Sequence, residues 1–102
     1  MELKVIKLTV KQRQYLKGLA HDLDPVVMIG DKGLTDAVVK EINTALTAHE
    51  LIKIRVLGED RELRNSLIEK ICEASQSSLV QHIGKILVYY RPNEMKQKIQ
   101  IK

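Results

Sequence analysis

Residues 26–35 read VVMIGDKGLT, and this stretch decides the fold. Its first part, Val26–Ile29, is apolar, rich in β-branched residues and preceded by Pro25, which predicts a short buried strand. The segment Gly30–Gly33 predicts a turn, and Thr35 is a favourable N-cap for a helix. A strand, a glycine turn and a helix start are therefore expected to follow one another directly.

Upstream of this stretch, the sequence predicts a helix that begins after Thr9. Thr9 and Gln12 have the spacing of a capping box, in which a hydroxyl and an amide satisfy helix N–H groups. Apolar residues then share one helix face, namely Tyr15, Leu16, Leu19, Ala20 and Leu23. The opposite face carries Arg13, Lys17 and His21. The helix is expected to end at Asp24, because a residue that precedes proline is driven out of the α region.

Downstream, helical and strand-like periods keep alternating. The inner face of the helix that Thr35 begins is predicted to contain Val38, Ile42, Ala45, Leu46 and His49. Residues 51–57 alternate between apolar and polar, which predicts a strand whose second face is basic through Lys53 and Arg55. Asp60 is expected to cap a third helix with the inward residues Leu63, Leu67, Ile71 and Ala74.

The last third of the chain is interpreted as a loop followed by two strands. Residues 75–84 are expected to form a loop with a single helical turn around Leu79 and Val80. Residues 86–90 predict a strand, Pro92-Asn93 a turn, and residues 96–101 an alternating edge strand. The fold class is therefore α/β, in the order helix, strand, helix, strand, helix, strand, strand, on a mixed four-stranded sheet. We expect residues 1–102 to form one domain.

The charge of the chain points to a polyanionic partner without proving one. The formal net charge is +4 and the isoelectric point is near 9.3. Residues 1–17 and residues 85–102 each sum to +4, so the middle sums to −4. This distribution suits one face to polyanions, although it is equally compatible with a charge that only keeps the protein in solution. With no Trp or Phe and 3 Tyr, any RNA is expected to be bound through its backbone and shape.

Several classes of function are not expected. No apolar run is long enough to span a membrane, and the charged N-terminus does not resemble a secretory signal. The single cysteine, Cys72, is interpreted as a small core residue and suits a reducing cytoplasm. The histidines His21, His49 and His82 do not have metal-ligand spacing with Cys72. We therefore expect no metal, no cofactor, no small-molecule substrate and no enzymatic activity.

The glycine turn has the chemistry of an anion site. Glycines can adopt positive φ and leave space for a ligand, and the following helix start offers unsatisfied N–H groups. Lys32 adds a mobile cation, whereas the carboxylate of Asp31 would repel a phosphate. A Gly-x-x-Gly sequence alone is more often only turn geometry, and this one lacks the Gly-Lys-Ser/Thr ending of a nucleotide-hydrolysing P-loop.

The same stretch also resembles a known family. Residues 27–35, Val39 and Ile42, residues 50–56, and residues 83–85 and 88–92 follow in the order found in the CRM domain. That domain is the RNA-binding module of chloroplast splicing and ribosome maturation factors. A lone domain of this length is similar to the bacterial single-domain YhbY family of ribosome-associated assembly proteins.

This resemblance implies a fold, a function and a site. The fold is expected to be similar to the C-terminal domain of bacterial translation initiation factor three, with a KH-like Gly-x-x-Gly loop that clamps RNA backbone. The implied partner is RNA of the precursor of the large (50S) ribosomal subunit, within the ribosomal particle, and the implied role is assistance in ribosome assembly. The resemblance assigns RNA contacts to the turn itself, to Lys53 and to Arg91. Asp31 departs from it, because a neutral or basic residue would suit RNA better.

The full set of RNA-binding candidates is Gly30, Asp31, Lys32, Gly33, Thr35, Lys53, Arg55, Arg91, Arg13 and Lys17. The alternative for Lys53 and Arg55 on the strand, and for Arg13 and Lys17 on the helix, is that they are surface cations that only contact water. Two other functions remain open. One is a protein-interaction adaptor that docks on ribosomal proteins or assembly factors, which would need an exposed apolar patch or strand edge. The other is a small phosphate-metabolite enzyme, which would need a deep pocket.

Overall fold

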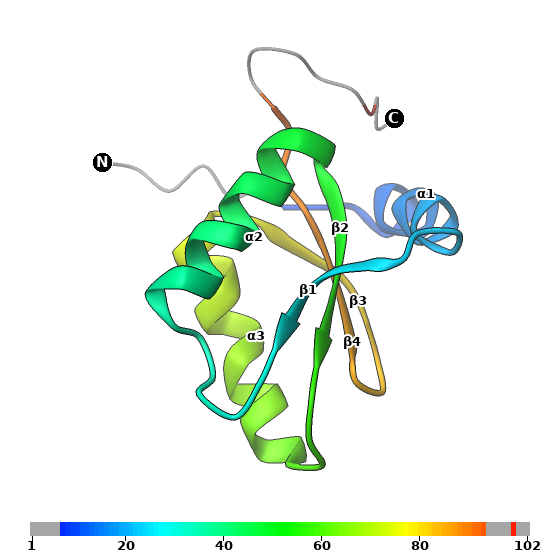
Figure 1. Ribbon diagram of the computed structural model, residues 1–102. Coiled ribbons are helices and arrows are strands. Elements are labelled where there is room, and N and C mark those ends of the chain that lie inside the picture. Colours follow the sequence, from blue (N-terminus) through cyan, green and yellow to red (C-terminus); the bar gives the residue numbers. More distant parts are fainter. Residues whose placement is uncertain (1–6, 94–98, 100–102) are drawn as a thin grey trace.

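The computed structural model describes residues 7–93 and Ile99. Three helices and four strands alternate along the chain (Figure 1). They are α1 (Val10–Ala20), β1 (Pro25–Ile29), α2 (Asp36–His49), β2 (Leu51–Val56), α3 (Arg61–Ser75), β3 (Ser78–Ile83) and β4 (Ile86–Tyr90). The order of element types in the described residues is the predicted one, but its last two strands are residues 78–83 and 86–90, whereas the prediction placed them at residues 86–90 and 96–101.

The four strands form one mixed sheet in the order β1-β2-β4-β3. β1 and β2 are parallel and are joined through α2, as expected for strands connected by a helix. β4 is antiparallel to both of its neighbours, β2 and β3. The predicted α/β fold with a mixed four-stranded sheet is therefore confirmed.

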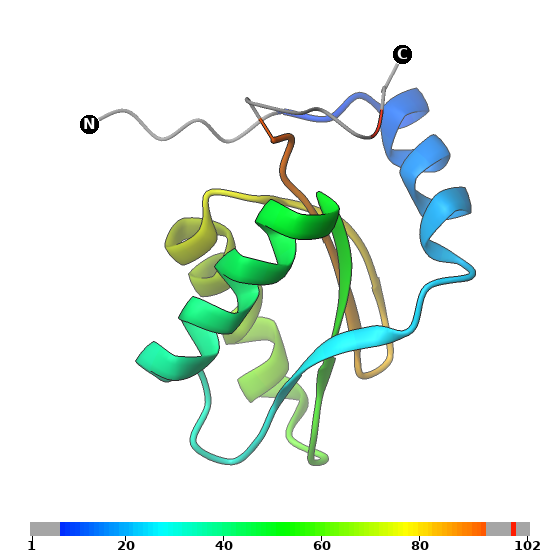
Figure 2. The same cartoon turned by 45° about the horizontal axis from the view of Figure 1, so that its top comes forward.

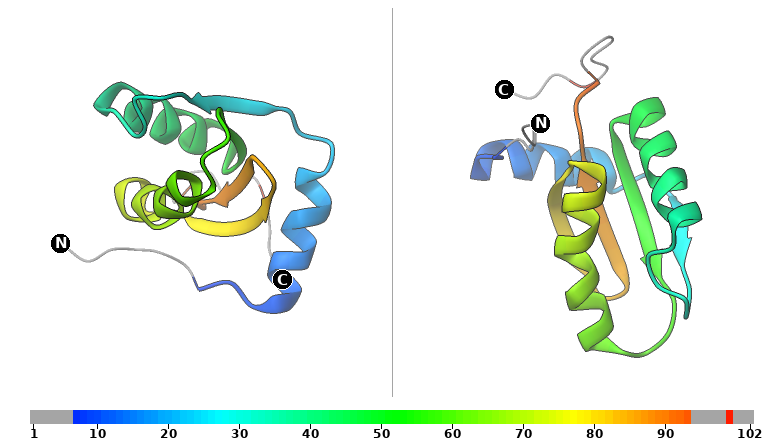
Figure 3. Two further views of the ribbon diagram at one scale, coloured as in Figure 1. Left: turned by 90° about the horizontal axis from the view of Figure 1, so that it is seen from below. Right: turned by 90° about the vertical axis from the view of Figure 1, so that its left-hand side faces the viewer.

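The helices cover both faces of the sheet. α2 and α3 pack on one face over a core that includes Ile42, Leu46, Leu67 and Ile71. α1 packs on the other face, where Leu16 and Ala20 contact residues Leu51, Val80, Val88 and Tyr90. Figure 2 and Figure 3 show α1 separated from the α2–α3 pair by the sheet. α3 therefore lies on the same face of the sheet as α2 and close to the glycine turn. α1 lies on the opposite face.

The three predicted helix caps are confirmed. Thr9 and Gln12 form a reciprocal capping box with two bonds of 3.0 Å. The Thr35 hydroxyl accepts a hydrogen bond from the N–H of Val38 at 3.2 Å, and the Asp60 carboxylate accepts one from Leu63 at 3.1 Å. Each cap satisfies an N–H group that the helix itself leaves unpaired.

The interpretation of residues 75–84 as a loop with a helical turn is wrong, because most of this segment forms the edge strand β3. A register shift between Leu79 and Gln81 interrupts the alternation of its side chains. Ser77 and Ser78 are buried, so the segment also lacks an apolar signal where it enters the sheet. The hairpin partner of β4 is thus β3. The edge strand predicted for residues 96–101 falls outside the described residues except for Ile99.

Several side chains predicted to face the core are exposed instead. They are Tyr15, Leu19 and Leu23 near α1, Val26 and Met28 in β1, and His49 and Ala74 near the helix ends. β1 is buried only on the face toward α2 and α3, so the prediction of a buried strand is wrong for Val26 and Met28. At the end of α2 the fully buried residue is Glu50, the C-cap with φ 65°, and not His49.

Candidate nucleic-acid interface

The glycine turn connects β1 to α2 at one end of the sheet (Figure 1). The N–H of Gly33 donates to the carbonyl of Gly30 at 3.0 Å, and the N–H of Thr35 donates to the carbonyl of Gly33 at 3.1 Å. Gly33 has φ +69°, the left-handed region that favours glycine, whereas Gly30 does not have a positive φ. A Cβ at either glycine would meet nothing within 4 Å. The turn is thus open enough for a polymer backbone to approach it.

Thr35 serves the turn by ordering the helix that follows it. Its hydroxyl accepts from the N–H of Val38, and Asp36 stands in the first helical turn. The cap uses one of the N–H groups that a helix start offers to an anion. Thr35 is therefore placed to position the turn through its hydroxyl.

An open hollow of about 580 Å³ lies between the turn and α3. Residues 31–34 line one side, and α3 contributes the residues Leu63, Leu67, Lys70, Glu73 and Ala74. The cations Lys32 and Lys70 are matched there by the carboxylates of Asp31 and Glu73, so their formal charges cancel. The hollow therefore has no strong positive field of its own. An anion would bind there through backbone N–H groups and through the ammonium group of a lysine side chain that turns toward it.

Lys70 is a site residue that sequence reasoning missed. It stands on α3, more than thirty residues after the turn, and only the packing of α3 beside α2 brings it to the hollow. Lys70 follows the buried Leu67 by three residues, so the sequence places it at the edge of the buried face of α3. The sequence does not indicate which loop that edge of the helix faces.

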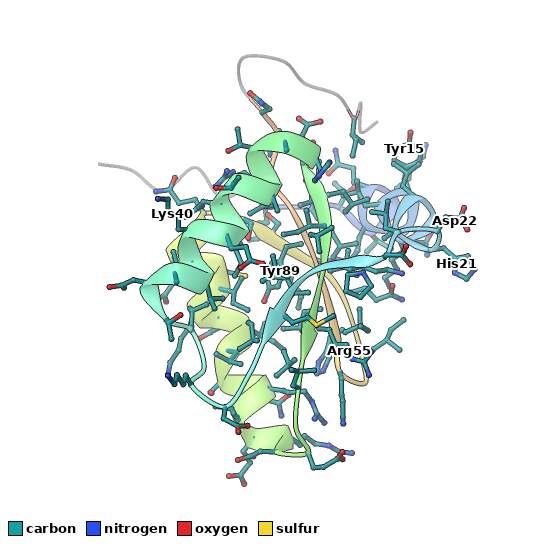
Figure 4. The ribbon with its side chains drawn as sticks, viewed as in Figure 1. Tyr15, His21, Asp22, Lys40, Arg55 and Tyr89 are labelled. Atoms are coloured by element: carbon teal, nitrogen blue, oxygen red, sulfur yellow. The ribbon has the colours of Figure 1, made fainter. Side chains whose placement is uncertain are left out.

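Lys53 and Arg55 lie in β2 on the face of the sheet that α1 partly covers. Their neighbours Ile52, Ile54 and Val56 are buried against α2 and α3, which confirms the predicted apolar face of this strand. Lys53 is partly buried, and its Nζ donates to the carbonyl of His21 at 3.4 Å. Arg55 is exposed, and Figure 4 shows it on the side of the sheet away from α2.

Arg13 and Lys17 are not brought to the glycine turn. They line a separate hollow of about 670 Å³, together with Lys7 and His82, between α1 and the edge strand β3. α1 lies across the sheet from α2 (Figure 3). The cations that line this hollow therefore form a second basic surface. The two surfaces can contact one RNA molecule only if that molecule passes around the edge of the domain.

Arg91 has its guanidinium turned into the protein. Nη1 donates to Asn43 Oδ1 and to the carbonyl of Ser75, both at 2.7 Å. Nη2 donates to the carbonyl of Asn43 at 3.1 Å and to the hydroxyl of Thr47 at 2.9 Å. Burial lowers the pKa of this side chain from its ordinary value. These bonds tie β4 to the ends of α2 and α3 and favour a structural role for Arg91 over the predicted phosphate contact.

The remaining chemistry-bearing residues do not assemble around the turn. In the part of the chain that the structure describes, no three His, Cys, Asp or Glu side chains come together as a metal site. Cys72 is half-buried against the core, and desolvation raises the pKa of its thiol. None of the described helices is sufficiently long and apolar to cross a membrane.

Comparison with known proteins fits this arrangement. The family model described as the CRS1 / YhbY (CRM) domain matches residues 8–91, from the segment before α1 to the end of the sheet. The chain belongs to the CRS1/YhbY (CRM) domain family. The resemblance first noted in residues 27–35 is therefore confirmed, and the family match covers every helix and strand described above.

Relatives of this CRM domain are found in several organisms. An "RNA-binding protein" of Haemophilus influenzae is 53% identical over 94 residues, covering 92% of this chain and 94% of the relative. "Probable RNA-binding protein YqeI" of Bacillus subtilis is 38% identical, covering 92% and 98%. The solution structure of the hypothetical protein SAV1595 from Staphylococcus aureus superposes with a TM-score of 0.81 at 38% identity, covering 94% of this chain and 100% of that one.

Proposed function

We propose that this protein binds RNA and uses the glycine turn as a clamp on the RNA backbone. The observation that carries the proposal is an open Gly-x-x-Gly turn at a strand–helix junction in a chain 53% identical to a protein named for RNA binding. Its target is RNA of the large (50S) ribosomal subunit precursor, and its role is to assist assembly of that particle in the cytoplasm.

The geometry of the turn supports a backbone contact. Gly33 lets the chain reverse without a side chain, so a phosphate can come close to the N–H groups at the start of α2. Lys32 is exposed in the turn, and Lys70 stands across the hollow from it. The ammonium groups of Lys32 and Lys70 can thus bind two successive phosphates of one RNA strand. The carboxylate of Asp31 repels a phosphate and therefore lowers the affinity of the turn for RNA.

The wider interface includes Arg55 on the sheet and the basic hollow of Arg13 and Lys17. Both surfaces carry exposed or partly exposed cations, which neutralise phosphates and add affinity without reading sequence. Lys53 contributes less, because its ammonium already contacts the end of α1. We leave Arg91 out of the interface, because its guanidinium is bonded inside the protein.

The test is a binding titration with a fragment of large-subunit ribosomal RNA across a salt series. Wild type is compared with Lys32→Glu in the turn and with Lys40→Glu, which makes the same charge change on the outer side of α2 (Figure 4). Each neutralised phosphate releases counterions, so the logarithm of affinity should fall steeply with the logarithm of salt concentration. Lys32→Glu should lower affinity at least tenfold and make the slope shallower by about one unit.

The outcomes separate the possible roles of the turn. A folded Lys32→Glu variant that loses affinity while Lys40→Glu does not identifies the turn as the clamp. Equal losses in both variants mean that only net charge matters, and equal binding by all three proteins means that the turn is structural. Binding to mature and precursor large subunits, measured by co-sedimentation, then tests the proposed target.

A protein-interaction adaptor is a second candidate with an observation of its own. An apolar hollow of about 430 Å³ is lined by residues that include Leu19, Leu23, Val26 and Ile99. Such a surface suits a protein partner. If wild type does not bind protein-free RNA but does bind ribosomal particles, the adaptor function replaces the RNA clamp.

A further inference from the structure

A row of four side chains crosses the sheet at the end that carries the glycine turn. Met28 of β1 is paired with Arg55 of β2, and Arg55 is paired with Ile86 of β4. Ile86 is in turn paired with Ile83 of the edge strand β3. We call these four residues, Met28, Arg55, Ile86 and Ile83, the sheet row. Each of the four strands contributes one residue to it.

The sheet row lies on the face opposite α2 and α3. Its neighbours along the strands, Val27, Ile54 and Leu87, are buried in the core under those two helices. Successive residues of a strand point to opposite faces, so the row points the other way. α1 shares that face but packs near Leu51 and Tyr90, toward the other end of β2 and β4.

The row is exposed at both of its ends. Met28 is 57% exposed and Ile83 is 59% exposed, while Ile86 between them is partly buried. Three of the four side chains in the row are apolar, and Arg55 stands between Met28 and the two isoleucines, so the row is a mostly apolar strip with one cation in it. With strands about 4.8 Å apart, the strip is about 14 Å long.

The charge on this face is one-sided. None of the four strands contains an acidic residue, and their cations are Lys53 and Arg55. Within the described residues, the guanidinium of Arg55 makes no hydrogen bond and no ion pair. Lys85, which follows β3, is paired with Glu59 at 2.7 Å. The face therefore complements a ligand that combines flat apolar surfaces with negative charge.

We propose that the sheet row holds unpaired bases of a single-stranded RNA segment whose backbone is bound at the glycine turn. This inference rests on the proposed function. Met28 stands two residues before Gly30, so one RNA strand can continue from the turn onto the row. Bases stack on the plane of an Arg side chain and make favourable contacts with a thioether sulfur. The sheet row contains no aromatic side chain on which a base could stack. Met28, Arg55 and Ile83 contact the bases in its place.

Single-stranded RNA suits the row better than duplex RNA does. In a duplex the bases are stacked on one another, and only their edges and the backbone reach a protein surface. A single strand can turn its bases onto a flat strip and keep its phosphates near Arg55 and Lys32. The row consequently predicts a preference for single strands that the turn alone would not give.

The experiment compares a 12-nucleotide single-stranded RNA with the 12-base-pair duplex of the same strand, each labelled for fluorescence anisotropy. The row variants are Met28→Thr, Ile83→Thr and Arg55→Ala. Val26→Thr is the matched control, because Val26 is also exposed on this face of β1 but lies two residues further from the turn. Lys32→Glu reports on the turn. Thermal unfolding checks that every variant is folded.

We expect Met28→Thr and Ile83→Thr to weaken single-strand binding about five- to tenfold, with less than a twofold change for the duplex. Arg55→Ala should weaken both RNAs, because Arg55 also belongs to the phosphate-binding surface, and the loss should be larger for the single strand. Val26→Thr should match wild type, and Lys32→Glu should weaken both RNAs. A 4-thiouridine in the single strand should crosslink to residues 25–29 or 83–86.

Three results overturn the inference in distinguishable ways. If the row variants bind the single strand as wild type does while Lys32→Glu loses it, the clamp stands and the row does not hold bases. If the row variants keep RNA affinity but no longer co-sediment with ribosomal particles, the row binds a protein. If wild type binds neither RNA, the proposed function fails first and this inference fails with it.

Discussion

Arg91 donates a 2.7 Å hydrogen bond from Nη1 to Oδ1 of Asn43, across forty-eight positions of sequence. The same guanidinium reaches the carbonyl of Ser75 and the hydroxyl of Thr47. It therefore joins the end of β4 to α2, which follows the glycine turn, and to α3, which lines the hollow beside that turn. Its contribution to RNA binding is expected to be indirect, through the stability of this arrangement.

Replacing Arg91 with Ala should lower the free energy of unfolding by about 2 kcal/mol, because several acceptors lose a charged donor. Urea unfolding measures this change. Arg55→Ala is the matched control, and it should stay within about 0.5 kcal/mol of wild type, since Arg55 is an exposed surface side chain. RNA affinity per folded molecule should be unchanged in the Arg91 variant. A large loss of affinity with full stability would return Arg91 to the interface.

The parts of the fold that local chemistry specifies were predictable from the sequence. Capping residues and helical periods mark where each helix begins and which element type follows. β3 was not predictable in this way, because a register shift and buried serines remove its alternating pattern. In the candidate site the turn was found from two glycines, whereas Lys70 and the inward guanidinium of Arg91 follow from packing between distant elements.

Glu50 shows the same limit for a buried charge. Nothing local indicates that this carboxylate is fully buried, where it accepts hydrogen bonds from the N–H groups of Asn93 and Ile99 at 2.5 and 2.6 Å. These bonds hold Asn93 and Ile99 at the end of α2. A positive φ of 65° at the same residue adds backbone strain that a sequence pattern does not reveal.

The two roles of Glu50 can be separated by two substitutions. Glu50→Ala should cost about 3 kcal/mol of unfolding free energy, because it removes a fully buried side chain that accepts two hydrogen bonds from partly buried N–H groups. Glu50→Gly should cost about 1 kcal/mol less, since glycine adopts positive φ without strain. Hydrogen exchange at the amides of Asn93 and Ile99 should become faster in both variants. Unchanged exchange would mean that the carboxylate does not hold Asn93 and Ile99.

The two glycines of the turn should respond differently to alanine. Gly33→Ala is expected to destabilise the protein by about 1 to 2 kcal/mol, because φ +69° is unfavourable for a residue with a Cβ. Gly30→Ala should be neutral or slightly stabilising, since its φ is not positive and its Cβ would meet open space. Thermal unfolding gives both values. If the stable Gly30→Ala variant binds RNA more weakly than wild type, the RNA backbone approaches the turn closely at Gly30.

Stability should depend on pH through Cys72. Burial raises the pKa of its thiol, so the unfolded chain loses this proton at a lower pH than the folded protein does. The stabilisation is fully present below the pKa of the thiol in the unfolded chain and is lost as pH rises through the higher pKa of the folded protein. Urea unfolding at pH 7 and about pH 9.5 should show a decrease that is smaller in Cys72→Ala. An equal decrease in both proteins would assign the effect to other groups.

Asp31 opposes the proposed clamp, and removing its charge tests the clamp in the direction of a gain. Asp31→Asn keeps the size of the side chain in an exposed turn position and removes the repulsion between a carboxylate and a phosphate. RNA affinity should rise about threefold at low salt, and the gain should shrink as salt screens the charge. Asp22→Asn provides the control, because Asp22 is exposed near the end of α1, away from the turn (Figure 4). If both variants gain equally, the effect is one of net charge. If neither gains, no phosphate lies near the turn.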